Sequence, residues 1–194
     1  MLAVLSAYFG WKDWSGRDLK HPAGIIVTQQ PQQTNLNTVV EFPFKGFQLV
    51  RKARFEIRAR VLSSEPYYWG TEAKLSPVDL ALGWGPMSDQ AILDKMEVSQ
   101  GSRWFFWQYD LPAPISDSTI TLNSGNMHII PQEKWLEKKV KALRNGDIVN
   151  LKGYLVDVSD ESGFRWTTSM TRKDTGNGAC EIFFLESMQL EGKT

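Results

Sequence analysis

The stretch "GDIVNLKGYLVDV" (146–158) indicates the fold, because it alternates like a β-strand and then changes its pattern at a glycine. Before Gly153, the apolar Leu151 is flanked by polar neighbours. After the glycine both faces are apolar, with Leu155 on one and Val156 on the other. A glycine inside a strand, where the pattern changes, is typical of a β-bulge or of the bend in a small barrel. We therefore expect a strongly curved sheet.

The segment "KARFEIRARV" (52–61) alternates more regularly, with small or large apolar residues on one face and charged residues on the other. This pattern is typical of a half-buried antiparallel strand. Further strands are predicted at 38–50, with a break at Pro-Phe-Lys-Gly, and at 102–111, 118–131, 164–172 and 179–190.

Three short helices are predicted, at 75–85, 88–96 and 132–146. The first begins with Ser76 and Pro77, which favour the N-cap and the first helical position. The third has an apolar stripe at helical spacing and a Glu–Lys pair four residues apart. The fold class that we predict is α+β, with a mostly antiparallel curved sheet or a small OB-like barrel and three short helices.

The composition is that of an ordinary globular protein. The chain has 194 residues, of which 42% are hydrophobic and 23% charged, and its 22 basic and 22 acidic residues cancel. A net charge of zero excludes a global attraction to nucleic acid or anionic lipid. We expect residues 1–37 to form an N-terminal apolar segment and an extended linker, and residues 38–194 to form a single globular α+β domain.

The N-terminal "MLAVLSAYFGW" (1–11) is apolar but has no basic residues and no small-residue cleavage site. It is too short for a spanning helix, which needs about 20 apolar residues. Two interpretations stay open: the remainder of a membrane anchor, or a short segment that docks on the domain. A membrane-associated or periplasmic location is favoured over a cytoplasmic one.

The sequence has none of the common phosphate-loop, dinucleotide-binding, zinc-protease or nucleophile-elbow motifs. A single cysteine excludes an internal disulfide and a cysteine-based metal cluster, and two histidines exclude a three-histidine site. We expect no metal and no cofactor.

One possible reactive pair is Cys180 with His128. A cysteine nucleophile needs a nearby base and a third group that orients the base, for which Asp174 and Glu181 are candidates. Against this, Cys180 is in register with the apolar Ile182, where a structural thiol belongs.

The surrounding "TSMTRKDTGNGACEIFF" (168–184) is predicted to be a β-hairpin with a "KDTGNG" turn. In that hairpin Arg172 and Cys180 lie on paired strands near its mouth. The side chain of Cys180 points inward and that of Glu181 outward.

A second candidate is a basic strand face, of the kind that OB-like sheets use for single-stranded nucleic acid. Its residues are Arg51, Lys52, Arg54, Arg58 and Arg60. Because Glu56 interrupts the row and the chain is neutral, nucleic-acid binding is disfavoured. A third candidate is "LGWGPMSD" (82–89), whose Trp84 either lines a pocket rim or, as we favour, fills the core.

Several blocks together resemble those of an uncharacterised bacterial protein family: "RARVLSSEPYYWGTEAKLSPVDLALGWGPMSD", "NMHIIP", "GDIVNLKGYLVDV" and "TRKDTGNGACE". The resemblance spans nearly the whole chain but implies no activity, cofactor or catalytic residue. It also implies an N-terminal apolar segment, and it marks as characteristic Asp79, Trp84, Asp89, Asn126, Met127, His128, Arg172, Asp174, Gly176, Cys180 and Glu181.

These observations favour a non-enzymatic binding or scaffolding module with an aromatic-rich surface, located at the bacterial envelope. Its partner would be a protein or a small molecule, and its candidate binding residues are Trp84, Asn126, His128, Arg172, Asp174 and Glu181. The first alternative is a cysteine-dependent hydrolase or acyltransferase that uses Cys180 and His128. The second is single-stranded nucleic-acid binding through the basic strand face.

Overall fold

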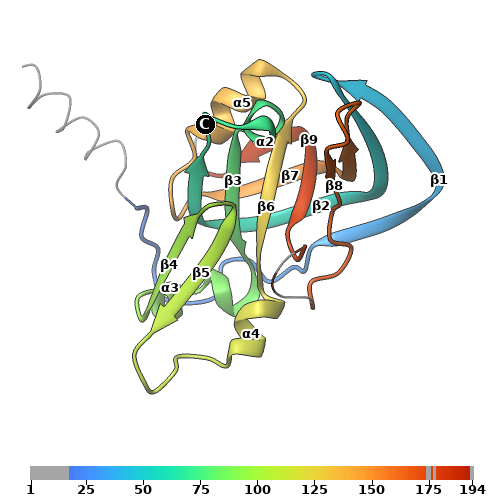
Figure 1. Cartoon of the computed structure of the whole chain (residues 1–194). Helices are drawn as coiled ribbons and strands as arrows, with labels where there is room; N and C mark the ends of the chain where they lie inside the picture. The colour runs from blue at the N-terminus through green and yellow to red at the C-terminus, as the bar shows by residue number, and fades with distance from the viewer. Residues whose placement is uncertain (1–17, 174–175, 177, 193–194) are drawn as a thin grey trace, which may run out of the picture.

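The computed structural model describes residues 18–173, 176 and 178–192. Its main feature is a seven-stranded sheet that curls until two of its strands, β2 and β7, meet and pair. The pairing order β2–β3–β6–β9–β7–β2 forms a ring around an apolar interior (Figure 1). The ring strands are β2 (Phe47–Pro66), β3 (Val78–Gly83), β6 (Ser124–Pro131), β7 (Ile148–Ser159) and β9 (Glu181–Leu190).

All pairings in the ring are antiparallel except that of β6 with β9. The predicted α+β class with a mostly antiparallel, OB-like curved sheet is therefore confirmed. The bulge at Gly153 is confirmed as well, because the register of β7 against β9 shifts between Lys152 and Gly153. A Cβ atom at Gly153 would lie 2.0 Å from the carbonyl oxygen of Phe184, so only glycine lets the strands approach this closely.

Strand β2 curves the sheet because it pairs along its length with β7 and, near its end, with β3. Its alternating apolar residues face the barrel interior, and they are Ala53, Phe55, Ile57, Ala59 and Val61. The outer strand β1 (Gln32–Phe44) pairs with β2, and the predicted break at Pro-Phe-Lys-Gly is the turn between them. Residues 32–37, which we expected in the linker, are thus the beginning of β1.

A second apolar cluster covers part of the outer face of the barrel. It contains Ile182 and Phe184 of β9, Ile130 of β6 and Val156 of β7. The ring of Phe42, from β1, packs edge-on against Phe184 at 5.1 Å. Where this cluster lies, strands β6, β7 and β9 are therefore buried on both faces.

The helix predicted at 132–146 is confirmed as α5 (Lys134–Lys141), with Leu136 and Val140 buried. The helix predicted at 75–85 is wrong: α2 (Thr71–Leu75) precedes this segment, and β3 occupies 78–83. All six residues of β3 are buried between β2 and β6. Strand pairing on both sides therefore overrides the local capping signal.

The helix predicted at 88–96 is in part correct. A 3-10 turn η1 (Gly85–Ser88) leads to α3 (Gln90–Leu93), and the carboxylate of Asp89 caps α3 by accepting from the amide of Ala91 at 2.8 Å. Strand β4 (Met96–Gly101) then pairs with β5 (Trp104–Tyr109) in a separate hairpin. This hairpin extends beside one end of the barrel, where α4 (Asp117–Leu122) also lies (Figure 1).

Two predicted strands are shorter than expected. The first part of 118–131 belongs to α4, which Ser116 caps by accepting from the amide of Thr119 at 3.2 Å. Of 164–172, only β8 (Arg165–Trp166) is a strand. The predicted hairpin at 168–184 is wrong, since the described residues between β8 and β9 form a loop. No helix among the described residues is long and apolar enough to cross a membrane.

Candidate functional site

Three ring strands bring an acid, an imidazole and a thiol together on the outer face of the barrel. Asp79 of β3 is directly opposite His128 of β6. Cys180 comes one residue before Glu181, which starts β9 and pairs with Met127. Because alternate residues of a strand share a face, Cys180 lies on the same face as His128.

The imidazole of His128 contacts both neighbours. Its Nδ1 lies 3.0 Å from Oδ1 of Asp79, and the ring is close enough to the side chain of Cys180 for the two to interact electrostatically. Within the described part of the chain, neither Nδ1 of His128 nor the second carboxylate oxygen of Asp79 has a hydrogen bond of good geometry. Asp79 is fully buried and His128 is 3% exposed, and the ring of Trp166 covers the imidazole at a centroid distance of 4.6 Å.

Arg103 holds the carboxylate from the other side. Its guanidinium donates to Oδ1 of Asp79 at 2.6 Å and to the carbonyl oxygen of Ser76 at 2.9 Å, and it stacks on the ring of Tyr67 at 3.8 Å. Arg103 and Ser102 form the tip of the β4–β5 hairpin, with φ angles of 70° and 52°. Positive φ is unfavourable for residues with a Cβ, so this turn stores strain that the contacts of Arg103 offset.

The charges of the site favour a protonated imidazole. Burial alone lowers the pKa of His128, but the adjacent side chains of Asp79 and Cys180 outweigh it and raise the pKa to about 9. The desolvated cation is thus stabilised by the acid beside it. At neutral pH the site therefore contains an imidazolium next to a sulfur atom, which is a common environment of reactive cysteines.

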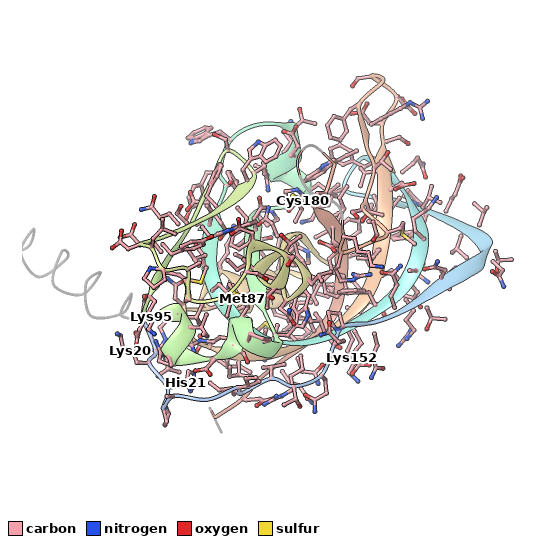
Figure 2. The ribbon with its side chains drawn as sticks, turned by 90° about the horizontal axis from the view of Figure 1, so that it is seen from below. Lys20, His21, Met87, Lys95, Lys152 and Cys180 are labelled. Atoms are coloured by element: carbon pink, nitrogen blue, oxygen red, sulfur yellow. The ribbon has the colours of Figure 1, made fainter. Side chains whose placement is uncertain are left out.

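Cys180 is partly exposed and borders two cavities. The amide nitrogen of Asn126 lies 3.5 Å from its sulfur and also donates to the carbonyl oxygen of Arg103 at 3.0 Å. Figure 2 shows Cys180 on the opposite side of the barrel from Lys20 and His21. A thiol, a hydrogen-bond donor beside it and open space around it therefore occur together at this site.

The structure brings together some of the predicted residues and separates others. Asn126, His128 and Cys180 share one face, whereas Trp84 is buried in the barrel and donates from its indole to Gln30 at 2.8 Å. The prediction that Glu181 points outward is wrong. It is 2% exposed, because its side chain lies on the inner face of β9.

Arg172 meets Glu181 across 3.4 Å, although not on paired strands as predicted. It also hydrogen-bonds the side chain of Gln33. Arg172 therefore connects the loop before Cys180 to β9 and to β1. Asp174, a candidate orienting group, lies outside the described residues.

The basic strand face is largely taken up by internal partners. Arg58 forms a two-pronged ion pair with Glu191, Lys52 lies 3.2 Å from Asp157, and Arg51 stacks on Tyr154. Arg60 is only 4% exposed. These contacts leave little free positive charge on this face.

Sequence reasoning missed the roles of Asp79 and Arg103. The resemblance marked Asp79 as characteristic, and its position inside the apolar run "VDLAL" was a further signal. A carboxylate in a buried strand requires a charged or hydrogen-bonding partner. For Arg103 we find no comparable signal in the sequence.

The described residues contain no group of three or more His, Cys, Asp and Glu side chains placed to hold a metal ion. No protein-family model, curated protein or solved structure matches the chain. Proposals about function therefore depend on the geometry of the site.

Proposed function

We propose that the protein is a cysteine-dependent acyl-transfer enzyme, either a hydrolase or an acyltransferase. The observation that carries this proposal is the position of the His128 imidazole, which lies 3.0 Å from the carboxylate of Asp79 and lines the same cavity as Cys180. A nucleophile, a base and an orienting acid in this order are the arrangement that activates a cysteine. Asp79 takes the orienting role for which the sequence suggested Asp174 or Glu181.

In the first step, the thiolate of Cys180 attacks the carbonyl carbon of an ester or thioester and forms a C–S bond. The bond from that carbon to the leaving group breaks, and the imidazolium of His128 gives its proton to the leaving oxygen or sulfur. A pKa of about 9 suits this order, since His128 begins the reaction protonated.

In the second step, water or an acceptor alcohol attacks the acyl-cysteine while the neutral imidazole of His128 accepts its proton. The C–S bond breaks and regenerates the thiolate. During both attacks a negative charge forms on the carbonyl oxygen. The amide of Asn126, 3.5 Å from the sulfur, is a donor that would stabilise this charge.

The test uses the fact that Cys180 is the only cysteine. Intact mass spectrometry after p-nitrophenyl acetate treatment would measure one acyl group per chain, and none in Cys180→Ala. His128→Gln should slow acylation at least tenfold, whereas His21→Gln, at the other histidine, should leave the rate unchanged. The proposal is overturned if Cys180 reacts no faster than a cysteine in a short unstructured peptide, or if both histidine variants behave alike.

A second candidate is the binding module with an aromatic surface, specifically one that binds an anionic membrane surface. Trp69, Tyr68 and Trp135 are 91%, 70% and 51% exposed. Lys139 lies 5.1 Å from the ring of Trp135, and Lys141 lies 5.6 Å from that of Tyr68. Exposed Trp and Tyr beside lysines suit the interface of a membrane with negative headgroups.

This candidate predicts co-sedimentation with anionic but not with zwitterionic phospholipid vesicles. The double change Trp69→Ala and Trp135→Ala should remove binding, whereas Trp104→Ala, at an exposed Trp on the β4–β5 hairpin, should not. Equal recovery with both kinds of vesicle would eliminate it. Because Cys180→Ala should not affect vesicle binding, the two candidates can be tested separately.

A further inference from the structure

The two cavities beside Cys180 differ in their linings. The smaller, of about 150 Å³, is walled on one side by the aromatic side chains of Trp104, Phe105 and Trp107. The larger, of about 380 Å³, is lined by charged groups that include Arg103 and Arg165, and by His128. Both cavities are in contact with Cys180, so a molecule bound covalently to the sulfur can extend into each of them.

We infer that the substrate is an ester or thioester with a short apolar acyl group, which enters the smaller cavity, and a polar leaving part, which occupies the larger one. This inference rests on the proposed acyl-transfer function. Residues that line the smaller cavity would then determine which acyl groups react, and residues that line the larger cavity would determine which leaving groups are accepted.

The position of His128 determines which half goes where. The imidazolium must protonate the leaving group, so the leaving group has to lie on the side of the sulfur where His128 is. His128 lines the larger cavity and is not among the residues that line the smaller one. The acyl group is then directed into the smaller cavity, which Asn126 also lines.

The size and charge of the smaller cavity limit the acyl group. Its 150 Å³ is below the roughly 300–1,000 Å³ of pockets that enclose whole drug-sized ligands. The two charged residues in its wall, Arg172 and Glu181, are paired with each other at 3.4 Å. A short, uncharged chain in contact with the aromatic rings fits these limits better than a long or an ionised one.

The experiment measures acylation of Cys180 by p-nitrophenyl acetate, butyrate, hexanoate and octanoate. The leaving group is the same throughout, so differences in rate report on the acyl side alone. We expect the acetyl or butyryl ester to react fastest and the octanoyl ester at least tenfold more slowly. Release of p-nitrophenolate and the intact mass of the chain give two independent readouts.

Two variants change the cavity in opposite directions. Trp107→Ala should enlarge it and move the preference to a longer chain, and Thr121→Leu should narrow it and move the preference to a shorter one. Phe106→Ala is the matched control, because Phe106 neighbours Trp107 but is half exposed and does not line the cavity. Circular dichroism identifies any variant that fails to fold, and the second variant then carries the test.

The outcomes separate this inference from the proposed function. If no ester acylates Cys180, the proposed function itself is wrong. If all four esters react at similar rates, or if the cavity variants change the profile no more than Phe106→Ala does, acyl transfer survives and the cavity assignment is overturned. A shift of the optimum in opposite directions for the two variants would support it.

Discussion

Among the described residues, positive charge is buried both around His128 and around Arg60, and only the cluster around His128 includes a thiol. In the first, the imidazole of His128 and the guanidinium of Arg103 share the carboxylate of Asp79. In the second, the guanidinium of Arg60 donates to the carbonyl oxygen of Ser88 at 3.1 Å and to the side-chain oxygen of Gln90 at 2.5 Å. The Arg60 cluster thus has neutral acceptors where the His128 cluster has an acid.

The difference appears in the direction of the pKa shifts. Burial lowers the pKa of Arg60, since the more distant charges of Asp94 and the other nearby carboxylates do not compensate for the lost water. The pKa of His128 is raised because Asp79 is in contact with it. A buried cation without an adjacent acid is held in place by its hydrogen bonds, at a cost to its charged form.

The Arg60 cluster also borders a cavity, of about 300 Å³, but none of the described residues that line it is a Cys, Ser or Thr. Its contacts join β2 to the segment before β1, because Gln90 also accepts from the amide of His21 at 3.0 Å. Buried charge next to a cavity is therefore not sufficient evidence for catalysis. The distinguishing feature is a thiol that lines the same cavity as the titrating group.

The largest effect that we expect is from Asp79→Asn. Without the carboxylate, the imidazolium of His128 loses its counter-charge, and acylation of Cys180 should slow by about 10²–10⁴-fold. Stopped-flow release of p-nitrophenolate measures the rate. Arg60→Met is the comparison variant, and it should react like the wild type. If the two variants lose reactivity equally, the distinction between the clusters fails.

The pH dependence of stability should also distinguish the His128 cluster from the Arg60 cluster. The pKa of His128 is raised from its ordinary 6.5 to about 9, so its contribution is fully present below pH 6.5 and is lost as the pH rises through 9. The free energy of unfolding, measured with urea, should fall over this window by up to about 3 kcal/mol. Arg60→Met should keep this slope. In Asp79→Asn most of it should disappear, and an unchanged slope there would contradict the assignment.

Fold features that depend on residues close together in the sequence are predictable from it, and features that depend on distant residues are not. The alternation of 52–61 and the change at Gly153 depend on neighbouring residues, and both predictions are confirmed. The helix prediction at 75–85 is wrong for the opposite reason. Its capping residues favour a helix locally, but the pairing of Val78–Gly83 with two other strands decides its structure.

The candidate site shows the same limit. The sequence suggested Cys180 with His128 and correctly placed Cys180 on the face of Ile182. That face predicts a structural thiol, and this stays a prediction. Cys180 lies just before β9, where it borders two cavities. Asp79 joins the site only through the register of β3 against β6, which the sequence did not predict.

A smaller effect is expected from Arg60→Met on stability. The substitution leaves the carbonyl oxygen of Ser88 and the side-chain oxygen of Gln90 without their donor, and this should cost about 1–3 kcal/mol. Urea unfolding measures the change. Arg60→Lys keeps the charge but offers fewer directed donors, so its free energy of unfolding should lie between those of Arg60→Met and the wild type. A neutral or stabilising effect of Arg60→Met would show that the hydrogen bonds of Arg60 do not stabilise the fold.

The smallest effect should come from Glu137→Gln, which removes ion pairs outside both clusters. Glu137 lies 2.7 Å from Lys141, one turn away on α5, and 3.9 Å from Lys45, and all three side chains are partly exposed. Water and salt screen such pairs, so the loss should be about 0.3–0.5 kcal/mol and should vanish at high salt. Urea midpoints at low and high salt test this. A loss as large as that of Arg60→Met would mean that burial does not determine how much these interactions contribute to stability.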